Sequence, residues 1–495
     1  MSRNEDFLKT AESLKPVLLK EEAVPAGFAP RVLGENESCL LNYGNHFTGR
    51  LKLRIGYQGN HPDAPLWLRI QFAERESELE EDIDSYQGWI SKSWIQREDI
   101  HLDVLPSEIL LPRRYAFRYV KITVLAASSK YRMVLEEAVC IAESSADDST
   151  LLPAHWDDDL PAEIDRTAVR TLHECMQYVF EDGPKRDRRL WLGDLRIQAK
   201  ANEMTYRNYD LVKRCLYLFA GCTDEEGRIP AAVFLEPEPQ RDDVMMFDYS
   251  LLFIQTLLEY YLSAGDLETL RELWPCAKRQ MELAEAQFEN DVIRDSDVLG
   301  WCFVDWDLNL NKQASAQGIY LYALKAAIRI AGILKEETDE SLLEELFERR
   351  RAAALKYFYD PASGLFESGA KRQRSAASQI WMVLGGVKEG KEAAELLSLI
   401  EQDNVVQPVT PYLMHYRIEA LTSCGEYEQA LSLIKEYWGG MVKEGADTFW
   451  ELYDPASPSV SPYGGTIVNS YCHAWSCAPA YFLRKYFMHD SAGDE

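Results

Sequence analysis

Residues 144–165, SSADDSTLLPAHWDDDLPAEID, divide the chain into two parts with different hydrophobic periods. The stretch is polar, acidic and interrupted by prolines, which is typical of a connection between domains. Alternating apolar and polar residues dominate before it, and a 3.6-residue period dominates after it. A chain of 495 residues is also too long for one compact core. We therefore expect one domain over 1–150, a linker over 151–165 and a second domain over 166–495.

Short alternating runs predict β-strands in the first part. Every second residue is apolar in LKLRIGY (51–57) and in LWLRIQF (66–72). The run YAFRYVKITV (115–124) alternates through Tyr119 and then changes register at Val120, which predicts a β-bulge. Turn-rich segments separate these runs, without long helical patterns between them. The first part is therefore predicted to be an antiparallel β-sandwich with an N-terminal extension.

The second part has the period of amphipathic helices. TAVRTLHECMQYVF (167–180) places its apolar residues on one helical face through Val179, and IYLYALKAAIRIAGIL (319–334) repeats the pattern. We count roughly twelve such segments between residues 165 and 488. Their loops are uneven and there is no fixed repeat length, which disfavours a solenoid. The count fits an (α/α)6 barrel of paired helices, whose loops at one end form a bowl suited to an active site.

Composition narrows the class of ligand. The net charge of −28 repels nucleic acids and anionic membranes, so neither is expected as a partner. The sequence contains no HExxH, P-loop, GxGxxG or EF-hand motif, and no metal or cofactor is predicted. The ten cysteines include no C-x-x-C pair, and MSRNEDFLKTAESLKP (1–16) lacks the apolar segment of a signal peptide. Both features predict a cytoplasmic location with reduced thiols. The sequence leaves open whether the protein forms a homo-oligomer.

Carboxylates beside tryptophans in predicted loops are the candidate site residues. Aromatic faces cover the C–H patches of a sugar ring, and carboxylates accept hydrogen bonds from its hydroxyls. Three segments combine the two residue types, 181–199, 300–309 and 445–455, and a further segment, 469–483, carries His473 and a tryptophan. The candidates in chain order are Asp182, Asp187, Trp191, Asp194, Asp305, Trp306, Trp450, Glu451 and His473. We expect them to bind a small carbohydrate.

Each candidate also has a simpler interpretation. With 81 acidic residues in the chain, any one aspartate is on the surface by default. The basic neighbours of Asp187 are then solvated partners of little energetic value. His473 is a structural histidine and Trp306 a core residue in this interpretation. The coincidence of acids, tryptophans and turn residues in separate loops favours a site.

The segment DGPKRDRRLWLGD (182–194) resembles the part of the glycoside hydrolase family 78 α-L-rhamnosidases that contains their general acid. GADTFWE (445–451) is similar to the late segment of that family, and NSYCHAWSCAPAYFL (469–483) to its closing helix. LPRRYAFRYVKI (111–122) resembles the strand domain that precedes the barrel. The resemblance thus covers most of the chain.

The resemblance implies a role for each matching residue. Asp187 falls at the general acid and Glu451 at the general base, which acts through water with inversion at the anomeric carbon. Asp182 and Asp194 match acids that hold the sugar hydroxyls, and Trp191 matches the tryptophan of the motif. The remaining candidates for the sugar subsite are Asp305, Trp306, Trp450 and His473. The sequence departs from the family where Asp187 replaces a glutamate and Leu190 replaces a glycine.

The expected function is therefore that of an inverting α-L-rhamnosidase, which releases terminal α-L-rhamnose from small glycosides. Two alternatives stay open at this point. One is a related barrel glycosidase that acts on another sugar. The other is a non-catalytic sugar-binding protein on a hydrolase scaffold.

Overall fold

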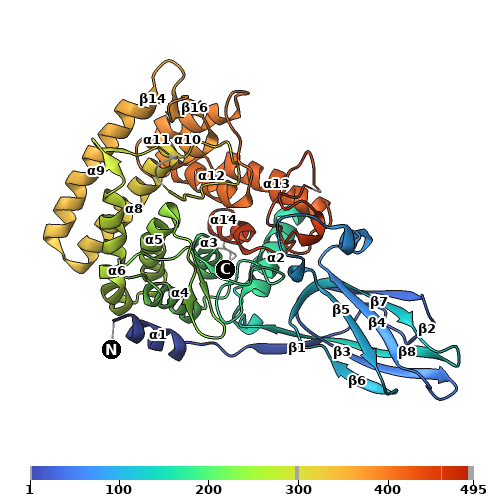
Figure 1. Ribbon diagram of the computed structural model, residues 1–495. Helices are drawn as coiled ribbons and strands as arrows, with labels where there is room; N and C mark the ends of the chain where they lie inside the picture. Colours follow the sequence, from blue (N-terminus) through green and yellow to red (C-terminus); the bar gives the residue numbers. More distant parts are fainter. Residues whose placement is uncertain (1–2, 296–299, 459, 489–495) are drawn as a thin grey trace, which may run out of the picture.

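A computed structural model describes residues 3–295, 300–458 and 460–488. In Figure 1 the β-strands form an elongated domain at the lower right, and the helices form a larger domain beside it. The predicted order, an antiparallel β-domain followed by a helical domain, is confirmed. Within the described ranges, every helix is too short or too polar to cross a membrane.

The β-domain contains eight antiparallel strands in one connected sheet. Their order is β1-β8-β3-β7-β4-β5, with β2 on β8 and β6 on β3. The predicted alternation is confirmed, because the side chains of Leu51, Leu53 and Ile55 are all fully buried in the same core. The strands are β1 (Leu19–Ala23), β2 (Arg31–Leu33), β3 (Ser38–Gly59), β4 (Leu66–Ala73), β5 (Arg97–Leu102), β6 (Ser107–Leu110), β7 (Tyr115–Ala126) and β8 (Tyr131–Ser144).

The register shift expected near Tyr119 is present, and the extra residues lie in the partner strand. Asn42 of β3 pairs with Tyr119 of β7, whereas the next pair is Phe47 with Phe117. The intervening residues of β3 bulge out of the ladder and carry His46, which is fully buried. The irregularity therefore directs a polar side chain toward the helical domain.

The helical domain contains twelve α-helices among the described residues. The outer helices are α2 (Asp159–Cys175), α4 (Tyr209–Gly221), α6 (Leu267–Glu285), α9 (Glu337–Phe358), α11 (Gly390–Ser398) and α13 (Tyr427–Lys443). The inner helices are α3 (Leu192–Glu203), α5 (Phe247–Ala264), α8 (Gln313–Leu334), α10 (Ala376–Leu384), α12 (Pro411–Ser423) and α14 (Ala478–Tyr486). Neighbouring inner helices contact one another in chain order, and α14 closes the ring against α3. This is the predicted arrangement of six helical hairpins.

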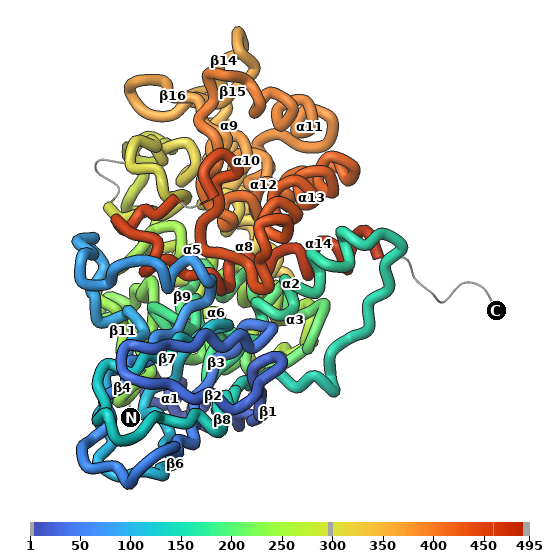
Figure 2. Tube along the Cα trace, turned by 90° about the vertical axis from the view of Figure 1, so that its right-hand side faces the viewer, coloured from blue at the N-terminus to red at the C-terminus, as the bar shows by residue number. Residues whose placement is uncertain are grey.

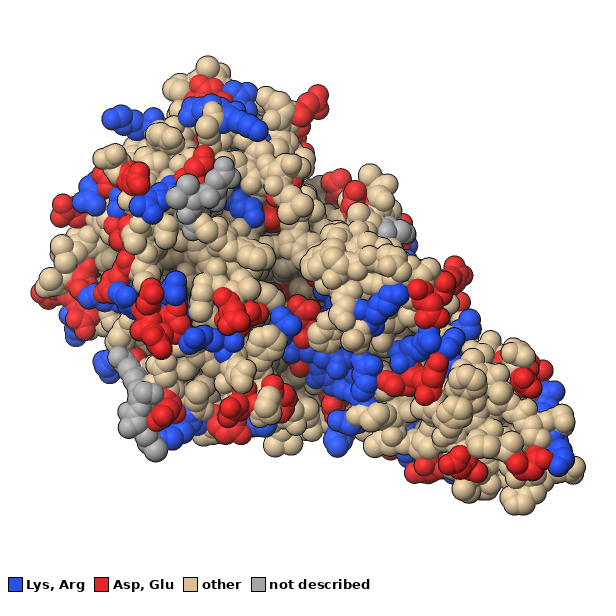
Figure 3. Space-filling model, in the orientation of Figure 1, with Lys and Arg blue, Asp and Glu red and all other residues tan. Residues whose placement is uncertain are grey.

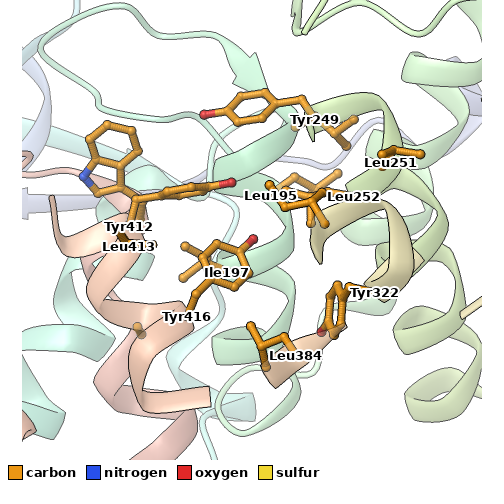
Figure 4. Packing of buried hydrophobic residues seen from close by; sticks show 14 of the residues in the cluster. Leu195, Ile197, Tyr249, Leu251, Leu252, Tyr322, Leu384, Tyr412, Leu413 and Tyr416 are labelled. Carbon is orange, nitrogen blue, oxygen red and sulfur yellow. The ribbon is translucent and has the colours of Figure 1, made fainter. Parts of the chain in front are cut away.

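The inner helices fill the centre of the barrel with large side chains. Figure 4 shows residues of α3, α5, α8, α10 and α12 converging there. The ring of Tyr412 lies 6.1 Å from that of Tyr249 and 5.0 Å from that of Tyr416, measured between centroids. Every residue of α10 is buried, as expected for a helix that is apolar all round. The centre is a solid core, and the chemistry must lie in loops at its end.

Two details differ from the sequence prediction. Helix α2 ends at Cys175, because Met176 adopts an extended backbone and forms a β-bridge with Phe180, so Val179 lies outside the helix. The N-terminal extension forms α1 (Arg3–Ser13), which packs against α4 of the helical domain. The rings of Phe7 and Tyr217 make this contact, with centroids 5.8 Å apart.

A buried ion pair joins the first and last helices of the barrel. The guanidinium of Arg484 in α14 donates to both carboxylate oxygens of Asp165 in α2, at 2.8 and 2.9 Å. We expect Arg484→Met to destabilise the fold by about 3–5 kcal/mol, because it leaves a buried carboxylate unpaired. A clear fall in the thermal unfolding midpoint would measure this effect. Lys391→Met is the control, since Lys391 is exposed and its ion pair with Glu395 lies on the surface. Equal midpoints for the two variants would contradict the prediction.

Candidate active site

The loop before α3 is shaped by the side chain of Asp182. Its carboxylate accepts the backbone N–H groups of Asp187, at 3.2 Å, and of Arg189, at 2.9 Å. The N–H of Asp182 donates in turn to the carbonyl of Arg189 at 3.0 Å. The loop then enters the short strand β9 (Leu190–Trp191) and continues directly into α3. These bonds turn the side chain of Asp187 outward from the loop, where it keeps 24% of its accessible surface.

Glu451 lies on the segment between α13 and α14. Its N–H donates to the carbonyl of Ser470 at 3.0 Å, and the indole N–H of Trp475 donates to its carbonyl at 2.9 Å. The side chain is more enclosed than that of Asp187, with only 6% exposed. Its backbone is thus fixed by the chain that leads into the last helix.

Arg186 brings the two predicted catalytic carboxylates together. Its guanidinium forms an ion pair with Glu451, 265 positions away in the chain, and its Nη1 lies 4.0 Å from Oδ1 of Asp187. Burial opposes a charge here, but Glu451, Tyr463 and Asp187 together outweigh it and raise the pKa of Arg186 above its ordinary value. Arg186 is therefore a permanent cation between the two acids.

Tyr463 completes the surroundings of this ion pair. Its hydroxyl donates to Oε1 of Glu451 at 2.5 Å, and its ring lies under the guanidinium of Arg186 at 4.0 Å from the centroid. Burial and the nearby Glu451 raise the pKa of Tyr463 well above its ordinary value, so the phenol stays protonated. Both oxygens of Glu451 thus have a fixed donor.

The environment of Asp187 favours a protonated carboxyl. Burial is the largest cause and raises its pKa. Arg186 and Arg189 oppose the shift, whereas the charges of Glu451 and Asp242 add to it. The pKa of Asp187 therefore lies above its ordinary value in spite of two adjacent arginines.

Asp182, Asp194 and His473 lie behind this pair. The imidazole Nε2 of His473 is 3.7 Å from Oε1 of Glu451 and 3.9 Å from Oδ2 of Asp182, and its Nδ1 is 3.5 Å from Oδ1 of Asp194. Among the described residues, that Nδ1 and that Oδ1 have no hydrogen-bond partner. Burial raises the pKa of both aspartates well above the ordinary value, and burial with Arg186 lowers that of His473. The group is therefore polar and buried, and each shift in pKa favours the uncharged form.

Aromatic side chains stand next to these acids. The half-buried ring of Trp306 lies edge-on to Tyr463 at 5.2 Å and to Trp475 at 6.0 Å. Trp191 keeps part of its surface exposed at the end of β9, immediately before α3. The helical domain is hollowed near the middle of the face that Figure 3 shows. Carboxyls and tryptophan faces in one place suit a sugar ring.

Two of the residues predicted to contact substrate, Asp305 and Trp450, are engaged within the protein. Asp305 uses both oxygens within the protein, because it accepts the N–H of Val409 at 2.7 Å and the N–H and hydroxyl of Thr410 at the start of α12. The ring of Trp450 is almost fully buried and covered by the guanidinium of Arg75 at 4.5 Å. Asp305 fixes a loop and Trp450 supports Glu451 from behind, so neither presents a free face to a ligand.

Sequence reasoning missed Arg186 and Tyr463. Arg186 stands directly before Asp187 but is one of several basic residues there, which made a solvated charge run the simpler interpretation. Tyr463 lies in ASPSVSPYGG (456–465), a stretch whose composition predicts only a turn-rich loop. The sequence signal that could have identified Arg186 was its place between two acids in a motif that also carries Trp191.

Comparison with known proteins gives the family context. Residues 7–142 match the glycosyl hydrolase family 78 alpha-rhamnosidase N-terminal domain, and residues 156–487 match the bacterial alpha-L-rhamnosidase 6 hairpin glycosidase domain. A comparison with curated proteins finds no match.

Solved structures resemble the whole chain. One is a rhamnosidase from Klebsiella oxytoca with rhamnose bound, with a TM-score of 0.95 and 45% identity over 98% of this chain and 99% of the other. Another is a GH78 family rhamnosidase of Bacillus sp. GL1, with a TM-score of 0.77 and 20% identity over 92% of this chain and 47% of the other. The second likeness concerns the fold alone.

The buried acid Asp194 is expected to cost stability at neutral and higher pH. Its pKa is raised in the folded state, so the folded protein holds the proton more tightly than the unfolded chain does, and stability is lost as the pH rises through the raised value. Asp194→Asn removes this loss. The unfolding midpoint of the variant should exceed that of the wild type by several degrees at about pH 8, with the gap closing toward about pH 4. Asp103→Asn, at an exposed position, is the control. A variant less stable than the wild type at about pH 8 would refute this account.

Proposed function

Because this chain belongs to glycoside hydrolase family 78, the α-L-rhamnosidases, we propose that it releases terminal α-L-rhamnose with inversion, using Asp187 as general acid and Glu451 as general base. The protein is a glycoside hydrolase, and its substrate is a small carbohydrate. The observation that carries the assignment of roles is the position of the Arg186 guanidinium. It forms an ion pair with Glu451 and lies 4.0 Å from Asp187.

The surroundings of Asp187 suit the role of the general acid. Inverting hydrolysis requires a protonated carboxyl beside the glycosidic oxygen, and the pKa of Asp187 is raised by burial and neighbouring carboxylates. Its side chain is also the more exposed of the two. In the reaction Asp187 gives its proton to the glycosidic oxygen, the bond from that oxygen to the anomeric carbon breaks, and the electron pair stays on the leaving oxygen.

Glu451 suits the base. The direct ion pair with Arg186 and the hydroxyl of Tyr463 hold its carboxylate in one orientation. Glu451 takes a proton from a water molecule while the water oxygen bonds to the anomeric carbon on the face opposite the leaving group. The configuration inverts, and both carboxyl groups return to their starting states by exchange with solvent.

The remaining side chains suit the recognition of one sugar ring. Asp194 and His473 are buried, and their polar atoms without partners among the described residues lie 3.5 Å from each other, so they would act on the sugar through Glu451 and Asp182 in front of them. The part-exposed rings of Trp191 and Trp306 would cover C–H faces. Asp182 would act mainly through the loop that carries Asp187. The cytoplasmic location expected from the sequence stays a prediction, which cell fractionation would test.

Removing either carboxyl group should abolish most of the activity. We expect Asp187→Asn and Glu451→Gln each to lower kcat on an alkyl α-L-rhamnoside by about 10²- to 10⁴-fold, because each removes one proton transfer. Steady-state kinetics with purified proteins would measure the loss, and thermal unfolding would verify that both variants fold. Asp243→Asn, an exposed acid in a neighbouring loop, should keep wild-type turnover. Near-normal turnover of both catalytic variants would refute the assignment.

The stereochemistry of the product tests the role of Glu451. A base that acts through water gives the β-anomer of rhamnose as the first product of an α-rhamnoside. Proton NMR recorded during the first minutes of hydrolysis, before mutarotation, would distinguish the anomers. Initial formation of the α-anomer would mean retention and exclude Glu451 as a base acting through water.

A further inference from the structure

We propose that the N-terminal β-domain positions both catalytic carboxyl groups, and that Lys185 is the residue that ties the loop of the general acid to it. This inference rests on the roles proposed for Asp187 and Glu451. It assigns to the β-domain a part in catalysis beyond covering the side of the barrel.

Lys185 crosses from the acid loop to the β-domain. Its ammonium group is buried and donates to Oε2 of Glu78 at 2.5 Å and to the carbonyl of Asn469 at 2.8 Å. Glu78 lies in a 3-10 helix (Glu76–Glu80) that follows β4. Lys185 is two residues before Asp187 and directly before Arg186. One side chain therefore fixes the acid loop against the β-domain and against the segment behind Glu451.

Glu74, at the end of β4, fixes the segment of the general base. Its Oε2 accepts the N–H of Tyr471 at 2.6 Å, and its Oε1 lies 3.0 Å from Nε2 of His46. The neighbouring Ser470 carbonyl accepts the N–H of Glu451. Since Glu78 accepts the N–H of Glu74 through its other oxygen, at 3.1 Å, the two glutamates form one unit. That unit contacts the acid loop through Lys185 and the base segment through Tyr471.

A second part of the β-domain contacts the segment of Tyr463, the residue whose hydroxyl donates to Glu451. The hydroxyl of Tyr86 donates to the carbonyl of Tyr463 at 3.0 Å, and the indole N–H of Trp89 donates to the carbonyl of Pro462 at 3.0 Å. Figure 2 shows this blue segment beside the red C-terminal segment. Tyr463 in turn donates to Glu451. The β-domain therefore reaches the base by two routes.

The charged hydrogen bonds between the two domains fix the positions of the atoms that they join. Burying ionised groups is costly, and an apolar contact of the same size would join two domains at least as stably. Charged hydrogen bonds are directional, however, and fix the atoms that they join. Displacing a catalytic group by about 1 Å from its reacting position can lower the rate by about 10²-fold. The Lys185–Glu78 pair thus suits the alignment of Asp187 better than simple adhesion.

The position of a general acid matters most for poor leaving groups, since a good leaving group departs without a proton. A misaligned Asp187 should therefore slow alkyl rhamnosides far more than nitrophenyl rhamnosides. A partly unfolded preparation would slow both substrates by the same factor. The ratio of the two kcat values separates positioning from stability.

The test compares Lys185→Met and Glu78→Gln with the wild-type full-length protein. Glu78→Gln keeps an oxygen for the N–H groups of Glu74 and Arg75 while it removes the charge that pairs with Lys185, so it tests the same tie if Lys185→Met does not fold. We expect kcat on methyl α-L-rhamnoside to fall by about 10- to 100-fold with little change in KM. The fall on 4-nitrophenyl α-L-rhamnoside should be at least about threefold smaller.

Lys130→Met is the matched control, because Lys130 pairs with Asp63 on the exposed surface of the β-domain. It should leave both rates unchanged. Equal losses on the two substrates, or none in either variant, would overturn the role of Lys185 in positioning Asp187 and leave the proposed function standing. A wild-type protein inactive on both rhamnosides would overturn the proposed function and this inference together.

Discussion

The site depends on one buried cation among four carboxyl groups. Arg186 pairs with Glu451 and lies within 4.0 Å of Asp187, while Asp182 and Asp194 are buried close behind. Gathering so many acids away from water is unfavourable unless some are neutral and others are paired. The guanidinium of Arg186 binds Glu451 directly, whereas burial raises the pKa of Asp187 against the opposing charge of Arg186. The ion pair at Glu451 and the burial of Asp187 together produce the asymmetry that inverting hydrolysis requires.

Barrel closure explains how residues so far apart in sequence meet. The acid loop precedes the first inner helix, α3, and the base segment precedes the last, α14, which packs against α3. The Arg484–Asp165 pair holds the same two ends of the ring together. A closed ring of hairpins thus converts the two ends of the helical domain into neighbours. The β-domain then lies beside this seam, where its glutamates can reach both segments.

Much of the fold could be predicted from hydrophobic periods, because a half-buried strand and an amphipathic helix each impose one on the sequence. The strands at Leu51 and Leu66 and the six hairpins follow that rule. The place of α1 could not be predicted, since Phe7 packs on a helix more than two hundred positions later. The end of α2 was missed because Val179 keeps the helical period after the backbone has turned at Met176.

The candidate site was predictable where chemistry and local pattern coincide. Asp182, Asp187 and Asp194 share one loop and helix start, and the family resemblance added Glu451. The environments of Asp305 and Trp450 depend on tertiary contacts. The hydroxyl of Thr410 donates to the carboxylate of Asp305, and the guanidinium of Arg75 covers the ring of Trp450. No local sequence pattern links these segments. The burial of Arg186 could not be predicted, because it stands in a run of basic residues. The composition of such a run is the same whether or not one of its arginines is buried.

The arrangement of Asp187 and Glu451 around one sugar is the central claim, and a crystal structure of the protein with rhamnose bound tests it most directly. We expect the anomeric carbon to lie between the two carboxyl groups, which should be about 6.5–9.5 Å apart to leave room for a water molecule. A sugar bound away from Arg186, or a separation of about 5 Å, would contradict it.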